Sequence, residues 1–334
     1  MHFPHPLLVC DVGGTNVRLA LQAYPGAPLD LLPAQKTQGH AGLPHSVRAA
    51  LSAGGIRPRS MVVCAAGPLV GRRLSLTNAD WFIDGPAIAE ALGLDQGLLL
   101  NDFEAQALCL PSALDEWFAA IGPRHASNNG VRVVLGPGTG LGVAALLTRD
   151  GRHLSLASEA SHIDFAPTMH DEATLWPHLT PVAGRITVES VISGAGLGNL
   201  HRARLCSLGL PPPSAAAADP VAINAAAVRD AASVEAETVR LFWRLTARFA
   251  GDMAITFMAD GGIVLAGGVL PRLASLIEPA AFRAAFERKA PVGHIVRAIS
   301  TRLLMYPEAV LLGMAAIASA PHDYAIDYAA RAWR

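Results

Sequence analysis

The sequence contains few lysines, few cysteines and few charged residues, and each shortage excludes a class of protein. Lys36 and Lys289 are the only two lysines, and no Gly-Lys-Ser or Gly-Lys-Thr triplet occurs, so the chain has no Walker A loop. Neither lysine lies in the strand context of a protein kinase or in a setting that favours Schiff-base chemistry. The four cysteines are far apart, which predicts reduced thiols and neither a disulfide framework nor a zinc knuckle.

Low charge and the lack of long apolar runs limit the partners. Charged residues make up 16% of the 334 residues and the formal net charge is −1, so no strong field attracts a phosphate backbone or an anionic lipid surface. No run reaches the roughly 18 apolar residues of a membrane span, and the first residues lack the pattern of a signal peptide. We therefore expect a cytoplasmic protein with neither nucleic acid nor a membrane as its partner.

Apolar residues are plentiful, at 51%, and they form alternating strand-like and helix-like segments typical of an α/β protein with two domains. The apolar runs Leu7–Asp11 and Val17–Leu21 flank Gly13-Gly14, which predicts a hairpin. A second pair, Val131–Leu135 and Val143–Leu147, flanks another glycine-rich turn 124 residues later. We interpret the two hairpins as an internal repeat, one per domain, although two glycine hairpins can also resemble each other by chance.

The remaining patterned segments alternate in the same way. The sequence predicts strands at Met61–Ala66, Leu98–Leu100 and Ile263–Ala266, and helices at Phe103 to Leu110, roughly Pro220 to Met258 and roughly Glu308 to Ala320. The low-complexity stretch Leu210–Asp219 indicates a surface loop. The segment from Pro321 to Arg334 has mixed character and supports no prediction.

Three glycine-centred turns carry the first chemical signal: Asp11-Val-Gly13-Gly14-Thr15, Gly136-Pro-Gly138-Thr139-Gly140 and Ala266-Gly267-Gly268. Glycine lets backbone N–H groups converge on an anion, threonine adds a hydroxyl donor, and the Asp11 carboxylate is suited to holding Mg²⁺ through water. Each turn alone is also typical of an ordinary hairpin, but the three together favour phosphate binding. They are not dinucleotide fingerprints, because Leu141 stands where the third glycine would be and strand leads back into strand.

These turns belong to an ordered set of motifs through which the chain resembles the bacterial glucokinases of the hexokinase–actin–Hsp70 ATPase superfamily. The matching pieces are LVCDVGGTNVRLAL (8–21), TNADW (77–81), LLNDFEA (99–105), LGPGTGLGVA (135–144), SEASHIDFAP (158–167), RITVESVISGAGL (185–197) and LAGGVLPRL (265–273). The resemblance implies two related actin-like, ribonuclease-H-like α/β domains with an active-site cleft between them. Residues 1–112 plus about 308–334 would form the small domain, and about 113–307 the large one.

Asp102 is the candidate catalytic base. It follows an apolar strand and precedes a helix, so the residues alone leave two interpretations open: a base that accepts a sugar proton, or a cap of the helix that starts at Phe103. The resemblance favours the base. It also implies that Asn101 binds a sugar hydroxyl.

The other sugar-binding candidates rest on the resemblance as well. Glu159 and His162 lie three residues apart and can face one cavity, yet they are also consistent with a solvated glutamate and a structural histidine. The family usually has two glycines where this chain has Ala160-Ser161. This departure from the pattern bears on the sugar preference. Glu189 is a third candidate, with a glutamate in the first turn of a helix as the alternative. Asn78 is a fourth.

The resemblance implies phosphorylation of glucose at its 6-hydroxyl by ATP with Mg²⁺. The glycines at 13–14 and 136–140 with Thr15 and Thr139 would bind the phosphates, Gly267-Gly268 would back the adenosine, and Asp11 would help to place the metal. The family also implies a homodimer. The alternatives are a kinase for another hexose or an N-acyl sugar, a non-catalytic sugar sensor, and a phosphatase or ATPase on the same scaffold.

Overall fold

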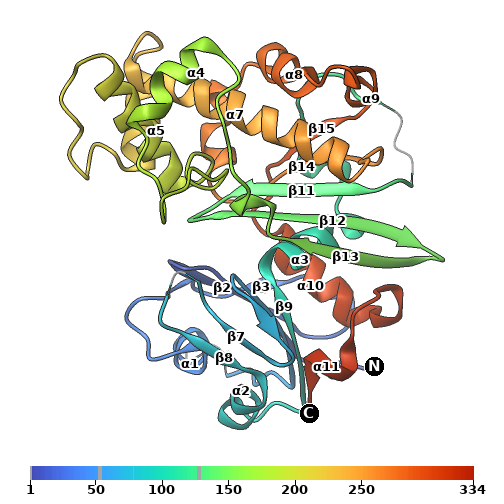
Figure 1. Cartoon of the computed structure of the whole chain (residues 1–334). Coiled ribbons are helices and arrows are strands. Elements are labelled where there is room, and N and C mark those ends of the chain that lie inside the picture. The colour runs from blue at the N-terminus through green and yellow to red at the C-terminus, as the bar shows by residue number, and fades with distance from the viewer. Residues whose placement is uncertain (1, 52–54, 78, 126–128) are drawn as a thin grey trace. The chain divides into compact units, whose positions relative to one another are not determined.

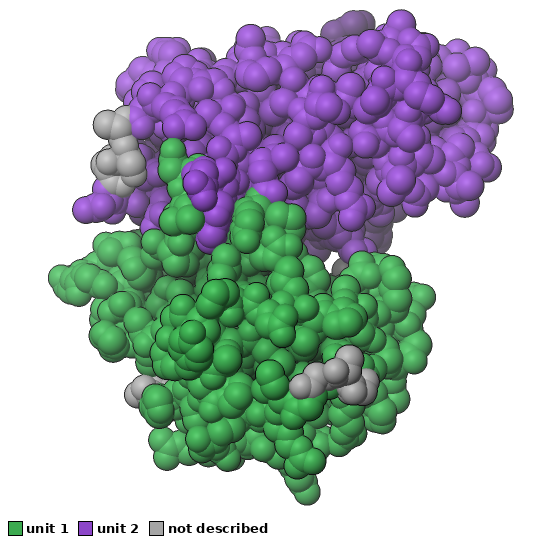
Figure 2. Space-filling view, turned by 180° about the vertical axis from the view of Figure 1, so that it is seen from behind, with its two compact units in different colours: residues 1–115, 146–156, 306–334 green, residues 116–145, 157–305 purple. Residues whose placement is uncertain are grey.

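The computed structural model describes residues 2–51, 55–77, 79–125 and 129–334, and it has the expected mixed α/β architecture (Figure 1). The chain divides into two compact units (Figure 2). Unit 1 comprises residues 1–115, 146–156 and 306–334, and unit 2 comprises residues 116–145 and 157–305. The proposed domain boundaries near residues 112 and 307 stay a prediction.

The sheet of unit 1 has a parallel centre. Strands β1 (Leu7–Val12), β5 (Ser60–Ala65) and β9 (Gln96–Asn101) run parallel, and β2 (Asn16–Gln22) pairs antiparallel with β1, which confirms the predicted hairpin. The three parallel strands are almost wholly buried, as is typical of strands covered on both faces. Because their carboxyl ends meet at one sheet edge, Asp11 and Asn101 emerge at the same edge with β5 between them.

The other elements of unit 1 complete this sheet and cover it. Helix α10 packs on α3 and on β1, so the last long helix of the chain lies against the parallel centre (Figure 1). Unit 1 also contains a small antiparallel sheet with the strand order β6-β7-β8. The bounds are β3 (Asp30–Leu31), β4 (Gln35–Lys36), α1 (Leu43–Leu51), β6 (Leu69–Val70), β7 (Arg73–Ser75), β8 (Phe82–Asp84), α2 (Gly85–Leu92), α3 (Asp102–Cys109), α10 (Ala309–Ser319), α11 (Tyr328–Arg331) and β16 (Ala332–Trp333).

The second sheet has the order β10-β15-β14-β11-β12-β13. Its strand β11 (Arg132–Pro137) pairs parallel with β14 (Gly262–Leu265) and lies beside β12 (Leu141–Arg149). This repeats the surroundings of β1, which has a hairpin partner on one side and a parallel strand on the other. The equivalent neighbours support the interpretation of the two glycine hairpins as a repeat.

Helix α7 (Val234–Thr256) is the centre of the core of unit 2. Fifteen of its residues are buried, and its aromatic residues join one apolar cluster with the inner strands. The remaining strands and helices between residues 116 and 305 are β10 (Phe118–Ala120), β13 (Arg152–Ser158), α4 (His170–Leu175), α5 (Gly194–Ser207), α6 (Pro220–Arg229), α8 (Pro279–Glu287), α9 (Gly293–Arg297) and β15 (Thr301–Leu304).

The helical prediction from Pro220 to Met258 corresponds to two helices rather than one. Helix α6 ends at Arg229, and α7 begins after Ser233, whose hydroxyl oxygen accepts a hydrogen bond from the Ala236 N–H at 3.1 Å. This N-cap, which satisfies a backbone donor at the start of α7, explains the break. Among the described residues, no helix combines the length and hydropathy needed to cross a bilayer.

Candidate active site

Asp11 lies near the end of β1, and both oxygens of its carboxylate have protein partners. Oδ2 accepts a hydrogen bond from the Nε of Arg18 at 3.0 Å and forms an ion pair with the same guanidinium. Oδ1 accepts from the Sγ of Cys64, on the adjacent strand β5, at 3.5 Å. The side chain is 16% exposed, so the carboxylate is fixed in direction and still reaches the surface.

The glycine turn that follows Asp11 is held by Thr37. The Thr37 hydroxyl donates to the Gly13 carbonyl oxygen at 2.8 Å, and its backbone N–H donates to the Thr15 carbonyl oxygen at 3.0 Å. Thr37 is 1% exposed, while Thr15 is exposed at the tip of the turn. The Gly13 N–H donates to the Asn16 carbonyl oxygen at 2.9 Å, so the turn is closed by hydrogen bonds while the Thr15 side chain stays exposed.

Asn101, and not Asp102, is the N-cap of helix α3, which corrects one alternative drawn from the sequence. The Asn101 Oδ1 accepts from the N–H groups of Phe103 at 3.0 Å and Glu104 at 3.2 Å. The Glu104 carboxylate accepts from the Asn101 N–H at 3.3 Å, which completes a capping box. The Asn101 Nδ2 donates to the Gly67 carbonyl oxygen at 3.2 Å, so one amide hydrogen is left for a ligand.

Asp102 opens α3 as its first residue. Its Oδ1 accepts a hydrogen bond from the Phe103 N–H at 2.9 Å. Burial, followed by the charge of Asp11 and then that of Asp102, raises the pKa of the Cys64 thiol well above its usual value. Unit 1 therefore brings together two of the predicted site carboxylates, Asp11 and Asp102, on either side of Cys64.

In unit 2, the two predicted phosphate and nucleotide turns pack backbone to backbone. A Cβ on Gly136 would overlap the Ala266 carbonyl oxygen, so only glycine fits there. Gly267 has φ +81°, and a Cβ on it would lie 2.6 Å from the Pro137 carbonyl oxygen. The Val269 N–H donates to that same oxygen at 3.2 Å. The sequence pattern of glycines thus reflects the contact of two loops as well as the space around a ligand.

Gly138, Thr139 and Gly140 form the exposed part of the first of these turns. No atom lies within 4 Å of the place a Gly138 Cβ would take, and the Thr139 side chain is exposed. The Gly194 N–H, at the start of α5, donates to the Gly138 carbonyl oxygen at 2.9 Å. The turn is therefore anchored on one side and open on the other.

Glu189 connects this turn with the other sugar-binding candidates. Its Oε2 accepts from the Leu141 N–H at 2.8 Å, and its own N–H donates to the Ser161 carbonyl oxygen at 2.9 Å. Because helix α5 begins only at Gly194, Glu189 is not a first-turn helix residue. The Arg185 guanidinium also donates to the His162 carbonyl oxygen, at 3.1 Å.

Glu159 precedes a turn of 3-10 helix at Ala160–His162, and His162 is the last residue of that turn. The His162 Nε2 lies 3.5 Å from the Glu159 Oε2, with the two side chains 54% and 86% exposed. Neither Ala160 nor Ser161 has a positive φ, so the residues that replace two glycines cause no backbone strain. The Ser161 side chain is 2% exposed and lies inside the protein.

The structure thus assembles the predicted residues as two groups, one in each unit. Unit 1 holds Asp11, Gly13, Gly14, Thr15, Asn101 and Asp102, and unit 2 holds Gly136, Gly138, Thr139, Gly140, Glu159, His162, Glu189, Gly267 and Gly268. Asn78 lies outside the described residues. Sequence reasoning missed Arg18 and Thr37, because their partners become neighbours only through the hairpin and a loop.

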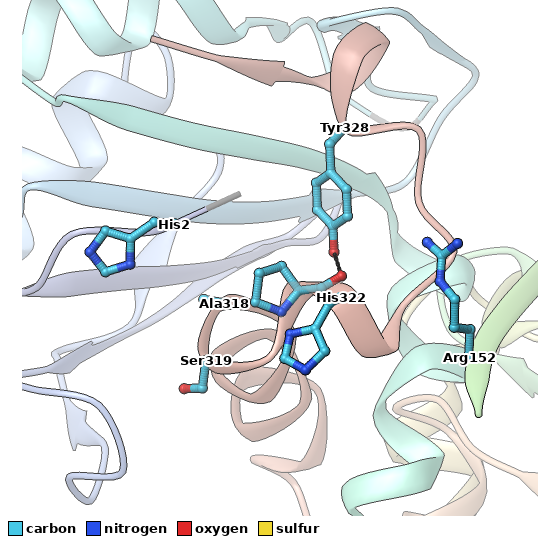
Figure 3. Close-up of a pocket in the computed structure, with 7 residues that line it drawn as sticks. His2, Arg152, Ala318, Ser319, His322 and Tyr328 are labelled. Carbon is cyan, nitrogen blue, oxygen red and sulfur yellow. Dashed lines mark hydrogen bonds between the residues drawn. The ribbon is translucent and has the colours of Figure 1, made fainter. Parts of the chain in front are cut away.

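Two cavities lie outside these turns or at their border. A cavity of about 150 Å³ is lined by Pro220, Val221, Asn224, Val269, Arg272 and Leu273, directly after Gly267-Gly268 in the fold. Another, of about 360 Å³, is lined by His2, Arg152, Ala318, Ser319, Pro321, His322 and Tyr328 and contains none of the predicted site residues (Figure 3).

A magnesium ion fits the donors around Asp11 only through water. The Asp11 Oδ2 already accepts two hydrogen bonds from Arg18 and Oδ1 accepts one from Cys64, but a carboxylate offers about four acceptor positions, so one remains for metal-bound water. Among the described residues, no cluster of three or more histidine, cysteine, aspartate or glutamate side chains can hold a metal. Mg²⁺ commonly retains several waters and takes its other ligands from substrate phosphates.

Comparison with known proteins gives one consistent result. The glucokinase family model matches residues 8–321. A glucokinase of Sinorhizobium medicae is 39% identical over 335 residues, covering 99% of this chain and 97% of the relative. The crystal structure of a glucokinase from an Antarctic psychrotroph superposes with a TM-score of 0.77 at 28% identity, covering 93% of this chain and 97% of the other.

A more distant structure shares the fold. It is a ROK family glucokinase from Streptomyces griseus in complex with glucose and AMPPNP, with a TM-score of 0.65 and 20% identity, covering 93% of this chain and 98% of that one.

Proposed function

The chain belongs to the glucokinase family, and from this premise we propose that it transfers the γ-phosphoryl group of ATP to the 6-hydroxyl of glucose. The observation that carries the proposal is the alignment with a glucokinase at 39% identity, which covers 99% of this chain and 97% of the relative. The ATP analogue and the glucose in the Streptomyces griseus structure support the choice of the two substrates.

Asp102 is the catalytic base of this proposal. As the glucose O6 attacks the γ-phosphorus, the new O–P bond forms, the bond to the bridging oxygen of ADP breaks, and the O6 proton passes to the Asp102 carboxylate. The remaining amide hydrogen of Asn101 donates to a sugar hydroxyl. The capping box keeps both side chains in place before the sugar binds.

Glu159, His162 and Glu189 bind the hydroxyls of the sugar, with Asn78 as a further contact. Carboxylates accept hydrogen bonds and an imidazole can donate or accept, so together they match a ring of adjacent hydroxyls. The hydrogen bonds of Arg185 to His162, and of Glu189 to Ser161 and Leu141, support their joint action, because movement of one loop is transmitted to the next.

The phosphates of ATP bind at Gly13–Thr15 and Gly138–Gly140, with the adenosine beside Gly267-Gly268. The cavity bordered by Val269 offers apolar walls for the base. Asp11 would hold Mg²⁺ through water, and the ion when bound supplies charge neutralisation for the phosphates. Arg18 keeps the Asp11 carboxylate in one orientation. We also propose a cytoplasmic homodimer, as expected for the family.

The deciding experiment is ADP production by the purified protein with Mg-ATP, with and without glucose. We expect glucose-dependent turnover, and we expect the variants Asp102→Ala and Asp102→Asn to lose about 10²–10⁴-fold in kcat, the usual contribution of a general base. The wild type's failure to respond to glucose would contradict the glucokinase proposal. Competing hexoses and N-acyl sugars in the same assay test the sugar preference.

A further inference from the structure

Residues 321–334, called here the 321–334 segment, have no part in the proposed reaction, yet unit 1 holds them firmly. The segment consists of a 3-10 turn at Pro321–Asp323, helix α11 and strand β16. The Tyr328 hydroxyl donates to the Pro321 carbonyl oxygen at 2.8 Å (Figure 3). The Arg152 guanidinium donates to the Tyr324 carbonyl oxygen at 3.1 Å.

Strand β16 docks this segment on the strand that leads to Asp102. Ala332 and Trp333 pair antiparallel with Leu98 and Gly97 of β9. Trp333 is 1% exposed, and a Cβ on Gly97 would overlap its ring. The segment is therefore an integral edge strand of the sheet, with its indole packed on a glycine that leaves it room.

This docking brings Arg331 to Glu104. The Arg331 Nη1 and the Glu104 Oε1 form an ion pair and a hydrogen bond, and the two side chains are 29% and 9% exposed. A carboxylate so deeply buried is costly without a partner. Arg331 is therefore the group that compensates the charge of Glu104 from a position 227 residues along the chain.

The second oxygen of the same carboxylate holds the turn before Asp102. Glu104 Oε2 accepts from the Asn101 N–H at 3.3 Å, while the Asn101 side chain accepts from the Glu104 N–H at 3.2 Å. Arg331, Glu104 and Asn101 thus form one continuous chain of hydrogen bonds. Asp102 lies within its capping box, between Asn101 and Glu104.

We propose that Arg331 is a positioning residue for phosphoryl transfer, which acts through Glu104 on the turn that carries Asn101 and Asp102. The proposal rests on the proposed function of Asp102 as the base. When the guanidinium is lost, the Glu104 carboxylate has an uncompensated charge, and it turns toward water. This movement weakens its hydrogen bond to the Asn101 N–H and lets the Asp102 carboxylate leave its position.

The test compares Arg331→Met, which keeps the length and removes the charge, with Arg331→Lys, which keeps the charge. We expect Arg331→Met to lower kcat by about 10- to 100-fold with less than about a threefold change in the KM for glucose, because a displacement of about 1 Å costs a reaction that much. Arg331→Lys should restore most of the loss. Amide hydrogen exchange at Asn101 should be faster in Arg331→Met and close to wild type in Arg331→Lys.

Arg152→Met is the matched control, since Arg152 also binds the 321–334 segment but does not contact Glu104. It should change the unfolding temperature at most, with kcat unchanged. Wild-type kcat and exchange in Arg331→Met, or a kcat loss equal in Arg152→Met, would overturn the proposal. A wild type that makes no ADP with glucose would refute the proposed function instead, and the exchange rates at Asn101 would still decide whether Arg331 holds the turn.

Discussion

The glycines of the motifs differ in their structural surroundings, and substitutions by alanine can measure the difference. Gly136 has the Ala266 carbonyl oxygen where a Cβ would be, whereas Gly138 faces open space. The first glycine is required by the packing of two loops. At the second, no atom lies within 4 Å of the place a Cβ would take, and a role in phosphate binding is our proposal for it.

We predict that Gly136→Ala and Gly138→Ala separate stability from nucleotide binding. Gly136→Ala should destabilise the fold by about 1–3 kcal/mol, as overpacking does. Gly138→Ala should leave the free energy of unfolding nearly unchanged and raise the KM for ATP, because the methyl group would stand where a phosphate approaches the backbone. Urea unfolding and steady-state kinetics on the two variants check this. An unchanged KM for ATP in Gly138→Ala would remove this turn from the phosphate site.

Cysteine reactivity is a second property decided at single residues. Burial, and then the charge of Asp11, raises the pKa of the Cys10 thiol, and burial with the charges of Asp11 and Asp102 raises that of Cys64. Both thiols therefore stay protonated at pH 8, and the thiolate is the reactive form. Mass spectrometry after alkylation of the native protein should find label on Cys206, which is partly exposed, before Cys10 or Cys64. Early labelling of Cys64 would contradict the buried environment beside Asp11.

Strand β16 and helix α5 each contain one buried side chain whose contribution to stability can be tested. Strand β16 is only two residues long, yet Trp333 is among the largest fully buried side chains. Helix α5 carries His201, which is 1% exposed and contacts Thr238 and Glu235. In both elements, a single buried side chain packs against residues that are distant along the chain.

Trp333→Ala should destabilise the protein by about 3–5 kcal/mol, the usual cost of removing a buried aromatic side chain. Phe82→Ala is the matched control, since Phe82 is an aromatic residue of the same unit that is 61% exposed. Its effect should stay within about 0.5 kcal/mol. Equal effects of the two substitutions in chemical denaturation would show that the 321–334 segment is not part of the cooperative fold.

His201 should make the stability of the protein depend on pH. Burial lowers the pKa of its imidazole below the ordinary value, and the nearby Glu235 carboxylate opposes the shift only in part. As pH falls through the unfolded pKa of about 6.5, the unfolded chain takes up a proton before the folded one, so stability decreases. We predict that the stability advantage of the wild type over His201→Gln shrinks from pH 7 to pH 5. A constant difference across that range in denaturant titrations would refute the assignment.

For the whole molecule, the division into two units matters most, because the proposed ligands of glucose come from both. Asp102 belongs to unit 1 and Glu189 to unit 2. A ligand that binds only the folded state raises its stability by mass action. The response of unfolding to glucose therefore reports which unit takes part in binding.

Glucose at 100 times its dissociation constant should stabilise the wild type by about 2.7 kcal/mol. At that same glucose concentration, Asp102→Ala and Glu189→Gln should each show a smaller shift of the unfolding midpoint, because each removes a hydrogen-bond partner of the sugar. Arg152→Met should retain the full shift. If only one of the two site variants reduces it, the sugar is bound by a single unit and the proposal of a shared site is wrong.

Much of the fold could be read from local patterns. The runs at Leu7–Asp11 and Val17–Leu21 form β1 and β2 because alternation places their apolar side chains in one core and two glycines permit the turn. The break between α6 and α7 was missed, although Ser233 is a typical N-cap residue. The Asp150-Gly151 turn, with φ values of 52° and 75°, was also missed, although the Asp-Gly pair is itself a hairpin signal.

The sequence by itself determined the α/β class, the family and the residue types of the candidate site, because these depend on periodicity and on short motifs in order. Only the tertiary structure decided that Thr37 holds the first glycine turn and that Arg331 reaches Glu104. The physical reason is distance along the chain. A hydrogen bond or an ion pair between residues 24 or 227 positions apart leaves no local pattern, and it exists only when the sheet and its edge strand bring the two groups together.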